Sequence, residues 1–476
     1  MSVDRRSPVP LYQQVKEYLL AFIREHRGEA TTVPSEVEIS KRFGISRATA
    51  RIAYQELVSE GLLDRVPGKG TFIRTRTRPL VLANWLSVEP MTREPFRGLL
   101  EGFRKTHPEA EVQDLGIPYE HLEHRLIFMA SSGGAPDLSA LVYLWIPQLA
   151  YQGALLPLDE LYSTAMRTGF DRKSLQTVSY RGQLFAVDWV SAPNLLFYNR
   201  RIVGEYLGTD SPAADTYEEL LEHFVRIHER SKGSIVPMSI PVVDDEILFL
   251  YSICNFLYAF DGGLISQEGE IIFNSVENIR AFTWLKGFVK AGHVDTAGGF
   301  RENRGRFARE QMAFLIEGPW LRRIAIELNP HRPGGLDSIG FSVLPKGPAG
   351  VSASVLWNHI LAIFRQCRDP ELALELVRYI TTDPGACERY YLATGLLPAF
   401  RGVLSGNAVY SDPFGAVLQK QMESAIPIPT GHPQPVSFLF AVMLCAKASR
   451  EILWGDAEVA ATLNRYASLM KEFYRK

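Results

Sequence analysis

The sequence has little cysteine and no apolar run long enough to cross a bilayer. Four cysteines occur among 476 residues, and none stands in a Cys-x-x-Cys pair, which argues against a disulfide framework. The most apolar run, residues 247–260, is short and contains Ser252 and Asn255, so we do not expect a transmembrane helix there. Residues 1–6 and the prolines that follow them lack the apolar core of a signal peptide. These features favour a cytoplasmic protein with no membrane partner.

Motifs for catalysis and metal binding are also missing. The chain has no Gly-x-Ser-x-Gly elbow and no P-loop. His121 and His124 stand three residues apart, but no cysteine or carboxylate cluster completes a metal site, so we expect both at the surface. Asp244-Asp245-Glu246 lacks the spacing of a calcium loop. We therefore predict no catalytic residue, no metal and no cofactor.

Charge is distributed unevenly along the chain. The formal net charge is only −2. Residues 1–78 nevertheless contain 14 basic and 9 acidic residues, so they carry +5, and the remainder carries −7. A basic head on an acidic body indicates that only the head meets a polyanion such as DNA.

The basic head has the pattern of a helix-turn-helix followed by a β-wing. Ser35-Glu36-Val37-Glu38 has the form of a capping box, and Gly44 can adopt the left-handed conformation of a tight turn. Ser46 suits the N-cap of a helix that ends near residues 60–61 and has one apolar face. Two short strands, 62–66 and 71–74, flank a glycine-rich turn.

This head resembles the GntR-type winged helix. The matching motifs are Pro10-Leu11-Tyr12, Val33-Pro34-Ser35-Glu36, Phe43-Gly44-Ile45-Ser46-Arg47-Ala48-Thr49, Leu57-Val58-Ser59-Glu60-Gly61-Leu62 and Gly68-Lys69-Gly70-Thr71-Phe72. The resemblance implies a homodimer that binds palindromic double-stranded operator DNA. The residues it assigns to DNA contact are Ser46, Arg47, Thr49, Arg51, Gly68, Lys69 and Gly70. One departure is Val37, because the family usually has a phosphate-contacting arginine there.

The rest of the chain alternates strands and helices. The pattern predicts strands at 80–85 and 111–116 and helices at 96–106 and 122–131, which indicates an α/β body with a mostly parallel sheet. About 400 residues exceed one compact core, so we expect two lobes. The expected domains are a winged helix at 1–74, a linker at 75–78 and a body at 79–476, with lobe one at about 79–192 and 346–403 and lobe two at about 193–345 and 404–476.

The body resembles the type 1 extracellular solute-binding proteins, which capture sugars for ABC importers. The motifs that carry the resemblance include Gly134-Ala135-Pro136-Asp137, Gly153-Ala154-Leu155-Leu156-Pro157-Leu158-Asp159, Tyr180–Trp189, Leu196-Phe197-Tyr198-Asn199-Arg200, Thr216-Tyr217-Glu218-Glu219-Leu220, Gln311–Trp320 and Leu344-Pro345-Lys346-Gly347-Pro348. The resemblance implies a type II periplasmic-binding-protein-like fold, in which two α/β lobes close on a ligand.

Aromatic residues at strand ends are candidates for a sugar site. A sugar presents apolar C–H faces and hydroxyl groups, so its site combines aromatic platforms with carboxylate and amide groups, and open α/β sheets bind ligands at their strand ends. Trp320 is the strongest candidate, because the resemblance places a stacking aromatic in Gly-Pro-Trp. We expect Trp284 in the core and Asp137 as a buried capping residue. The predicted ligand-binding residues are Trp85, Glu89, Tyr143, Trp145, Asp188, Trp189, Trp320, Trp357 and Asn358.

These features predict a transcription regulator controlled by a carbohydrate effector, and two alternatives stay open. The first is a winged helix joined to an aminotransferase-like domain that binds pyridoxal phosphate. Lys286, Lys290 and Lys346 lack the small-residue turn and partner aspartate that such a domain needs. The second is a solute receptor without a regulatory role, which the basic head argues against.

Overall fold

The computed structural model describes residues 4–5, 7, 9–26, 31–73, 79–162, 167–212, 214–241, 246–430 and 435–474. The expected linker at 75–78 and the acidic pair Asp244-Asp245 lie outside these ranges. Among the described helices, none combines the length and the hydropathy that a membrane span requires.

The head is a three-helix unit with a β-hairpin. Its elements are α1 (Leu11–Glu25), α2 (Glu36–Phe43), α3 (Arg47–Ser59), β1 (Leu63–Val66) and β2 (Gly70–Ile73). Both hydrogen bonds of the capping box at Ser35 are present, and Gly44 ends α2 with φ of 61°. The two strands pair antiparallel. The predicted helix-turn-helix and wing are therefore confirmed.

The first lobe of the body contains a six-stranded sheet in the order β16-β8-β15-β5-β3-β4. Its strands are β3 (Leu80–Asn84), β4 (Val112–Gly116), β5 (Leu138–Val142), β8 (Ala186–Ser191), β15 (His359–Ile363) and β16 (Leu397–Pro398). The helices of these stretches are α4 (Pro90–Thr106), α5 (Tyr119–Ser131), α6 (Ile146–Tyr151), α8 (Arg172–Thr177), α15 (Pro370–Thr382) and α16 (Pro384–Thr394). A small hairpin pairs β6 (Ser179–Tyr180) with β7 (Gln183–Leu184).

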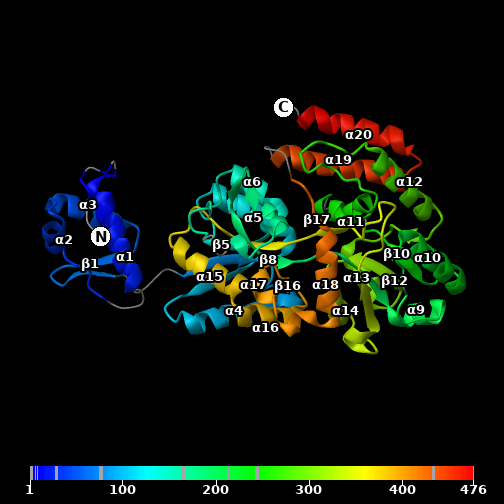
Figure 1. Cartoon of the computed structure of the whole chain (residues 1–476), viewed down its shortest axis with the longest axis horizontal. Coiled ribbons are helices and arrows are strands. Elements are labelled where there is room, and N and C mark those ends of the chain that lie inside the picture. Colours follow the sequence, from blue (N-terminus) through cyan, green and yellow to red (C-terminus); the bar gives the residue numbers. More distant parts are fainter. Residues whose placement is uncertain are drawn as a thin grey trace.

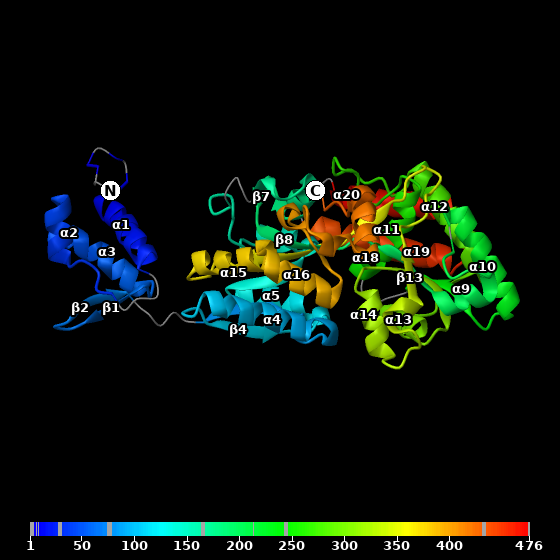
Figure 2. The same cartoon turned by 60° about the horizontal axis from the view of Figure 1, so that its bottom comes forward.

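The second lobe contains a five-stranded sheet in the order β11-β10-β12-β9-β13. Its strands are β9 (Leu195–Asn199), β10 (Val236–Ser239), β11 (Val294–Asp295), β12 (Met312–Glu317) and β13 (Ile339–Ser342). The helices of this stretch are α9 (Arg200–Leu207), α10 (Tyr217–Ser231), α11 (Glu246–Ala259), α12 (Val276–Lys290), α13 (Phe300–Ala308) and α14 (Leu321–Leu328). Figure 2 shows α4, α5 and β4 gathered in one lobe and α9, α10 and α13 in the other.

Two chain segments cross side by side between the sheets. Residues 192–194 join β8 to β9, and residues 357–358 join β14 (Ser354–Leu356) to β15. Trp357 N donates to Ala192 O at 2.9 Å, and Asn194 N donates to Val355 O at 3.1 Å. β14 pairs parallel with β17 (Ala425–Pro427). These hydrogen bonds tie the two segments to each other where the chain passes between the lobes.

The C-terminal part of the chain packs on the body. The elements after β16 are α17 (Arg401–Leu404), α18 (Pro413–Ser424), α19 (Pro435–Leu453) and α20 (Val459–Tyr474). The antiparallel pair α19–α20 lies against α11 and α12 (Figure 1).

The expectation of a mostly parallel sheet is wrong. Parallel pairs are confined to β3–β4, β3–β5, β10–β11 and β10–β12 within the two large sheets. β9, β13, β15 and β16 pair antiparallel with their neighbours. The sheets are mixed because β15 and β16 run against β3, β4, β5 and β8 in the first sheet, and β9 runs against its neighbours in the second. The predicted domain and lobe boundaries stay a prediction.

Candidate functional site

The predicted DNA-contacting residues of α3 lie at its exposed N-terminal end. The Ser46 Oγ accepts from Thr49 N at 3.1 Å and caps the helix, as predicted. Arg47 and Arg51 are exposed, whereas Ala50 and Ala53 face the core of the head. A helix-turn-helix presents such an end to the major groove.

The wing ends in an exposed turn between β1 and β2. Gly68 and Gly70 have φ of 75° and 115°, a region that favours glycine, and open space surrounds the position of a Cβ at both. Lys69 is exposed between them. The tip therefore offers backbone and one ammonium group for a close approach to phosphates.

Glu36 connects the wing to α3, which the sequence did not reveal. Its carboxylate pairs with Arg51, at 3.4 Å, and with Arg65 on β1. The Arg51 side chain is still 58% exposed. Glu36 therefore holds two arginines of separate elements on one side of the head. Arg65 was missed because only the tertiary structure brings β1 beside α2.

An aromatic cluster joins the two lobes of the body. From the first lobe, Trp85 follows β3 and its ring centroid lies 5.7 Å from that of Tyr119. The Tyr119 ring lies 5.5 Å from the ring of Trp145. The imidazole of His359, the first residue of β15, meets Trp85 edge to face at 5.0 Å.

The second lobe contributes Trp320, which follows β12. Its ring stacks on the imidazole of His359, with centroids 5.7 Å apart and planes 12° apart. Tyr251 of α11 lies 6.5 Å from Trp320 and 4.7 Å from Trp357 of the crossing segment. We call these residues the interlobe aromatic cluster: Trp85, Tyr119, Trp145, Tyr251, Trp320, Trp357 and His359.

A buried ion pair fixes the indole of Trp320. Trp320 Nε1 donates to Glu317 Oε1 at 3.0 Å, and the same oxygen accepts from Gly318 N at 3.0 Å. Arg304 Nε donates to Glu317 Oε2 at 2.9 Å, and the hydroxyl of Tyr251 lies 3.3 Å from Oε1. Glu317 is only 1% exposed and the Arg304 side chain is 26% exposed, so the carboxylate is the shielded partner of the pair. Since the carboxylate is held from several sides, the ring has little freedom to turn.

An exposed ion pair also spans the lobes. Arg301 of α13 lies 3.7 Å from Glu120 of α5. Glu89 occupies the N-cap position of α4 without a side-chain capping bond, and burial, with a contribution from Glu120, raises the pKa of its carboxyl. These side chains add charge next to the interlobe aromatic cluster.

Four predicted ligand-binding residues make other contacts. Trp189 is a core residue in this structure, with its ring 4.9 Å from Tyr390 and 6.2 Å from Phe96, so it does not lie beside Trp320. Asp188 points to the opposite face of β8, because neighbouring residues of a strand alternate. Asn358 Nδ2 donates to Asp188 Oδ2 at 2.6 Å, and burial raises the pKa of Asp188 well above its ordinary value.

Tyr143, the fourth, uses its hydroxyl within the body. It accepts from Ile428 N at 2.7 Å, and its ring is 6.4 Å from that of Trp357. Trp85, Trp145, Trp320 and Trp357 are thus the predicted aromatics that the structure brings together. Asp137 is buried, as expected, and its Oδ2 accepts from Val81 N of β3 at 2.8 Å, whereas its expected turn-capping role stays a prediction.

Sequence reasoning missed five residues around Trp320. Tyr119, Tyr251, Arg304, Glu317 and His359 come from five separate segments, and none belongs to a recognisable motif except Glu317, which directly precedes Gly318-Pro319-Trp320. That position was the one available signal. The others required knowledge of how the lobes meet.

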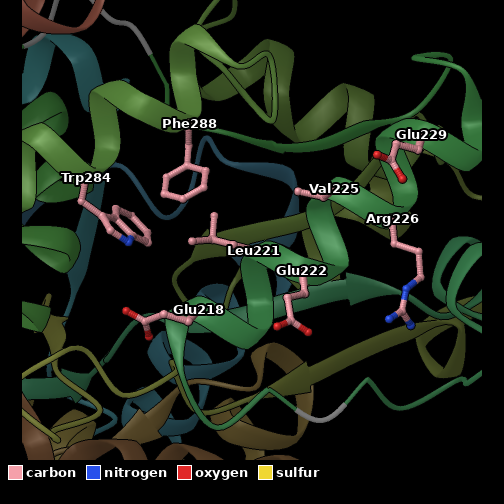
Figure 3. A pocket seen from close by; sticks show the side chains of 8 residues that line it. All are labelled: Glu218, Leu221, Glu222, Val225, Arg226, Glu229, Trp284 and Phe288. Atoms are coloured by element: carbon pink, nitrogen blue, oxygen red, sulfur yellow. The ribbon is translucent and has the colours of Figure 1, made fainter.

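A second feature of the surface lies away from these residues. Figure 3 shows Trp284 and Phe288 projecting from α12 toward Leu221 on α10. Together with their neighbours they line a groove of ≈ 590 Å³. The groove contains none of the predicted ligand-binding residues, and Trp284, expected in the core, is only partly buried.

Two family models match the chain. The model described as bacterial extracellular solute-binding protein matches residues 99–414. The model described as bacterial regulatory proteins, gntR family, matches residues 11–73. The first match covers most of the body, and the second covers the winged head.

Curated relatives divide in the same way. The chain is 22% identical to the maltotriose-binding protein of Pyrococcus abyssi over 346 residues, which cover 70% of this chain and 71% of that protein. It is 43% identical to the HTH-type transcriptional repressor NagR of Bacillus subtilis over 74 residues. That stretch covers 15% of this chain and only 30% of NagR.

Solved structures match the body. The GacH receptor of Streptomyces glaucescens, solved unliganded and with acarbose, has a TM-score of 0.71 at 18% identity and covers 84% of this chain and 100% of its own. An ABC transporter solute-binding protein of Thermotoga lettingae bound with α-D-tagatose has a TM-score of 0.72 at 19% identity, with the same coverage. Such low identity supports the fold alone. This chain belongs to the bacterial extracellular solute-binding protein family, and its N-terminal residues 11–73 add a DNA-binding head of the gntR family of bacterial regulatory proteins.

Proposed function

We propose that this protein is a transcription regulator whose affinity for operator DNA is set by a carbohydrate bound at the interlobe aromatic cluster. One observation carries the proposal: aromatic rings from both lobes meet at Trp320, beside a buried carboxylate. A ligand that inserted there would contact both lobes, so its binding would change their relative position.

The chemistry of the cluster suits a sugar. Indole and phenol rings offer flat apolar faces for C–H groups, and the exposed ion pair of Arg301 and Glu120 offers partners for hydroxyl groups. Relatives of the body are named for maltotriose or were solved with acarbose or tagatose. One was solved with glycerophosphocholine, so this compound belongs in any binding screen.

The head supports a regulatory role in the cytoplasm, where DNA is present. We expect a homodimer on a palindromic operator, with Ser46, Arg47, Thr49 and Arg51 in the major groove and Gly68–Gly70 at the backbone or minor groove. Val37 stands where the family usually has a phosphate-contacting arginine, so another residue must make that contact. Arg65, which shares Glu36 with Arg51, is our candidate for it.

A catalytic role has less support. The matched families are regulators and binding proteins, and we propose that the chain performs no catalytic step. Two of the lysines considered for pyridoxal phosphate have polar partners within the body. Lys286 Nζ donates to Ala457 O at 2.7 Å, and Lys290 pairs with Asp456 at 2.6 Å.

Binding at the cluster is tested by a thermal-shift screen of maltose, maltotriose, tagatose and glycerophosphocholine. A hit should raise the melting temperature of the wild type and change its tryptophan fluorescence. Trp320→Ala should abolish this binding, because it removes the stacking face shared by the lobes. Trp454→Ala, at a tryptophan that is 39% exposed, is the matched control and should bind normally. A folded Trp320→Ala protein with unaltered affinity would place the ligand elsewhere.

A further inference from the structure

His359 occupies the centre of the interlobe aromatic cluster. Its imidazole is 7% exposed and lies between two tryptophans of different lobes. The edge-to-face contact with Trp85 stays within the first lobe, and the parallel contact with Trp320 reaches the second. His359 is therefore the ring through which the two platforms touch.

The imidazole of His359 does not use its full hydrogen-bonding capacity. Nδ1 is buried and has no hydrogen-bond partner among the described residues. Burial also lowers the pKa of His359 to about 4, so the ring is neutral near pH 7. A buried polar atom without a partner costs free energy, and a native structure usually keeps one only where something else gains from it.

The parallel geometry resembles the geometry that a ligand would adopt. The imidazole is stacked on Trp320 with an offset, so it takes up part of a face on which the apolar side of a sugar could lie. Glu317 holds the indole in one orientation, so the sugar cannot use the ring by turning it away from His359. A ligand that stacks on this face must replace the imidazole.

We propose that His359 is a removable cover of Trp320, which the ligand displaces on binding. This inference rests on the proposed function, because it assigns the stacking face to a carbohydrate. In the ligand-free protein the cover shields Trp320, which is 9% exposed, from water. The imidazole thus competes with the ligand and lowers the apparent affinity of the site.

Displacement of the cover also acts on the crossing between the lobes. His359 begins β15 and directly follows the crossing residues Trp357 and Asn358. Trp357 N is hydrogen bonded to Ala192 O of the other crossing. The displaced imidazole would therefore leave a place directly beside the two hydrogen-bonded segments that connect the lobes.

The first test needs no ligand. Acrylamide quenching of tryptophan fluorescence is measured on the full chain for the wild type, His359→Ala, His359→Ser and His359→Phe. The two small variants should be quenched more strongly, because the face of Trp320 becomes accessible, and His359→Phe should resemble the wild type. The difference should vanish in a Trp320→Phe background. Equal quenching of all four proteins would overturn the covering role.

The second test uses maltotriose and, if it does not bind, the other compounds of the screen. If the cover is in place in about nine-tenths of the molecules, its removal should lower the apparent Kd on the order of tenfold. His359→Ala and His359→Ser should therefore bind more tightly than the wild type, and His331→Ala, at an exposed histidine, should not differ. Circular dichroism confirms that each variant folds.

The two tests separate two kinds of failure. Weaker or equal binding by both small variants would overturn the inference and would make His359 a direct ligand contact or a spectator. If no variant binds any compound of the screen, the proposed carbohydrate function fails, and displacement by a carbohydrate fails with it. The covering of Trp320 is then still decided by quenching alone.

Discussion

Arg51 is the side chain of α3 at which an effect on DNA binding is easiest to distinguish from an effect on the stability of the head. It is 58% exposed, and its ion pair with Glu36 is long at 3.4 Å. A good bidentate contact to a base is worth about 1–3 kcal/mol. Arg51→Ala should therefore weaken operator binding roughly tenfold or more and leave carbohydrate binding unchanged. Fluorescence anisotropy with a labelled operator duplex measures the effect.

A matched control for this substitution is found in the body. Arg97 of α4 is 57% exposed and pairs with Glu94, so Arg97→Ala removes the same charge at the same exposure. Operator affinity should not respond to it. Equal losses in the two variants would mean that only net charge matters, and unchanged affinity in Arg51→Ala would remove Arg51 from the DNA interface.

His359 should make the stability of the body depend on pH. Its pKa in the folded protein is about 4, below the ordinary value near 6.5. Between these values the unfolded chain binds a proton that the folded chain does not, so acidification favours unfolding. The stabilising contribution is complete above about pH 6.5 and is lost as the pH falls to about 4, with a total of roughly 3 kcal/mol.

The sign is tested by comparison with His359→Phe. The free energy of unfolding of each protein is measured with urea at several pH values. Asp188, whose pKa is raised by burial, titrates with the opposite effect but is present in both proteins. The free energy of unfolding of the wild type, minus that of His359→Phe, should fall by roughly 3 kcal/mol from pH 6.5 to pH 4. A difference that does not vary with pH would show that His359 is protonated normally.

At the scale of single elements, α2 depends on its capping box. The Ser35 Oγ accepts from Glu38 N, and the Glu38 carboxylate accepts from Ser35 N, which lowers the pKa of Glu38. Ser35→Ala removes the first bond and should destabilise the helix by about 1 kcal/mol. Hydrogen exchange of the α2 amides should accelerate accordingly. Ser59→Ala at the end of α3 is the control, and exchange in α2 should not respond to it.

Elements with strong local signals were predictable from the sequence. Ser35, Gly44 and Ser46 mark the helix ends of the head, and each was found in the predicted role. In the first lobe the predicted strands and helices were found with small shifts. The largest shift is at α4, which begins at Pro90 because Pro95 is accommodated inside the helix.

Strand direction and the membership of the interlobe aromatic cluster were less predictable, because both depend on tertiary neighbours that a local pattern does not reveal. The local pattern of β9 or β15 does not say which strands lie beside it, so the antiparallel pairs were missed. Trp85, Trp145, Trp320 and Trp357 were found because aromatic residues at strand ends carry a local signal. Trp189 also lies near a strand end but points into the core. The side of the sheet to which a strand residue points depends on the packing of helices on that sheet, which the local sequence does not show.

At the scale of the whole molecule, the account requires the two functions to be coupled. In the proposed homodimer, a ligand that displaces His359 and moves the lobes should change how the two heads sit on one operator. The predicted linker at 75–78 lies outside the described residues, but its shortness in sequence favours transmission of such a movement. A flexible Gly/Ser insertion after Arg76 should reduce the coupling and leave the affinity for carbohydrate without DNA unchanged.

The most direct measurement is the operator Kd of the wild type with and without a saturating carbohydrate that binds it. Coupling free energies are typically about 1–3 kcal/mol, so we predict a change of about 5–150-fold, and saturating operator must change the Kd of the carbohydrate by the same factor. The Trp320→Ala protein should keep its operator affinity and lose the response. An operator Kd that does not change when wild-type protein is saturated with carbohydrate would contradict the account, because the body would then bind its ligand without reporting it to the head.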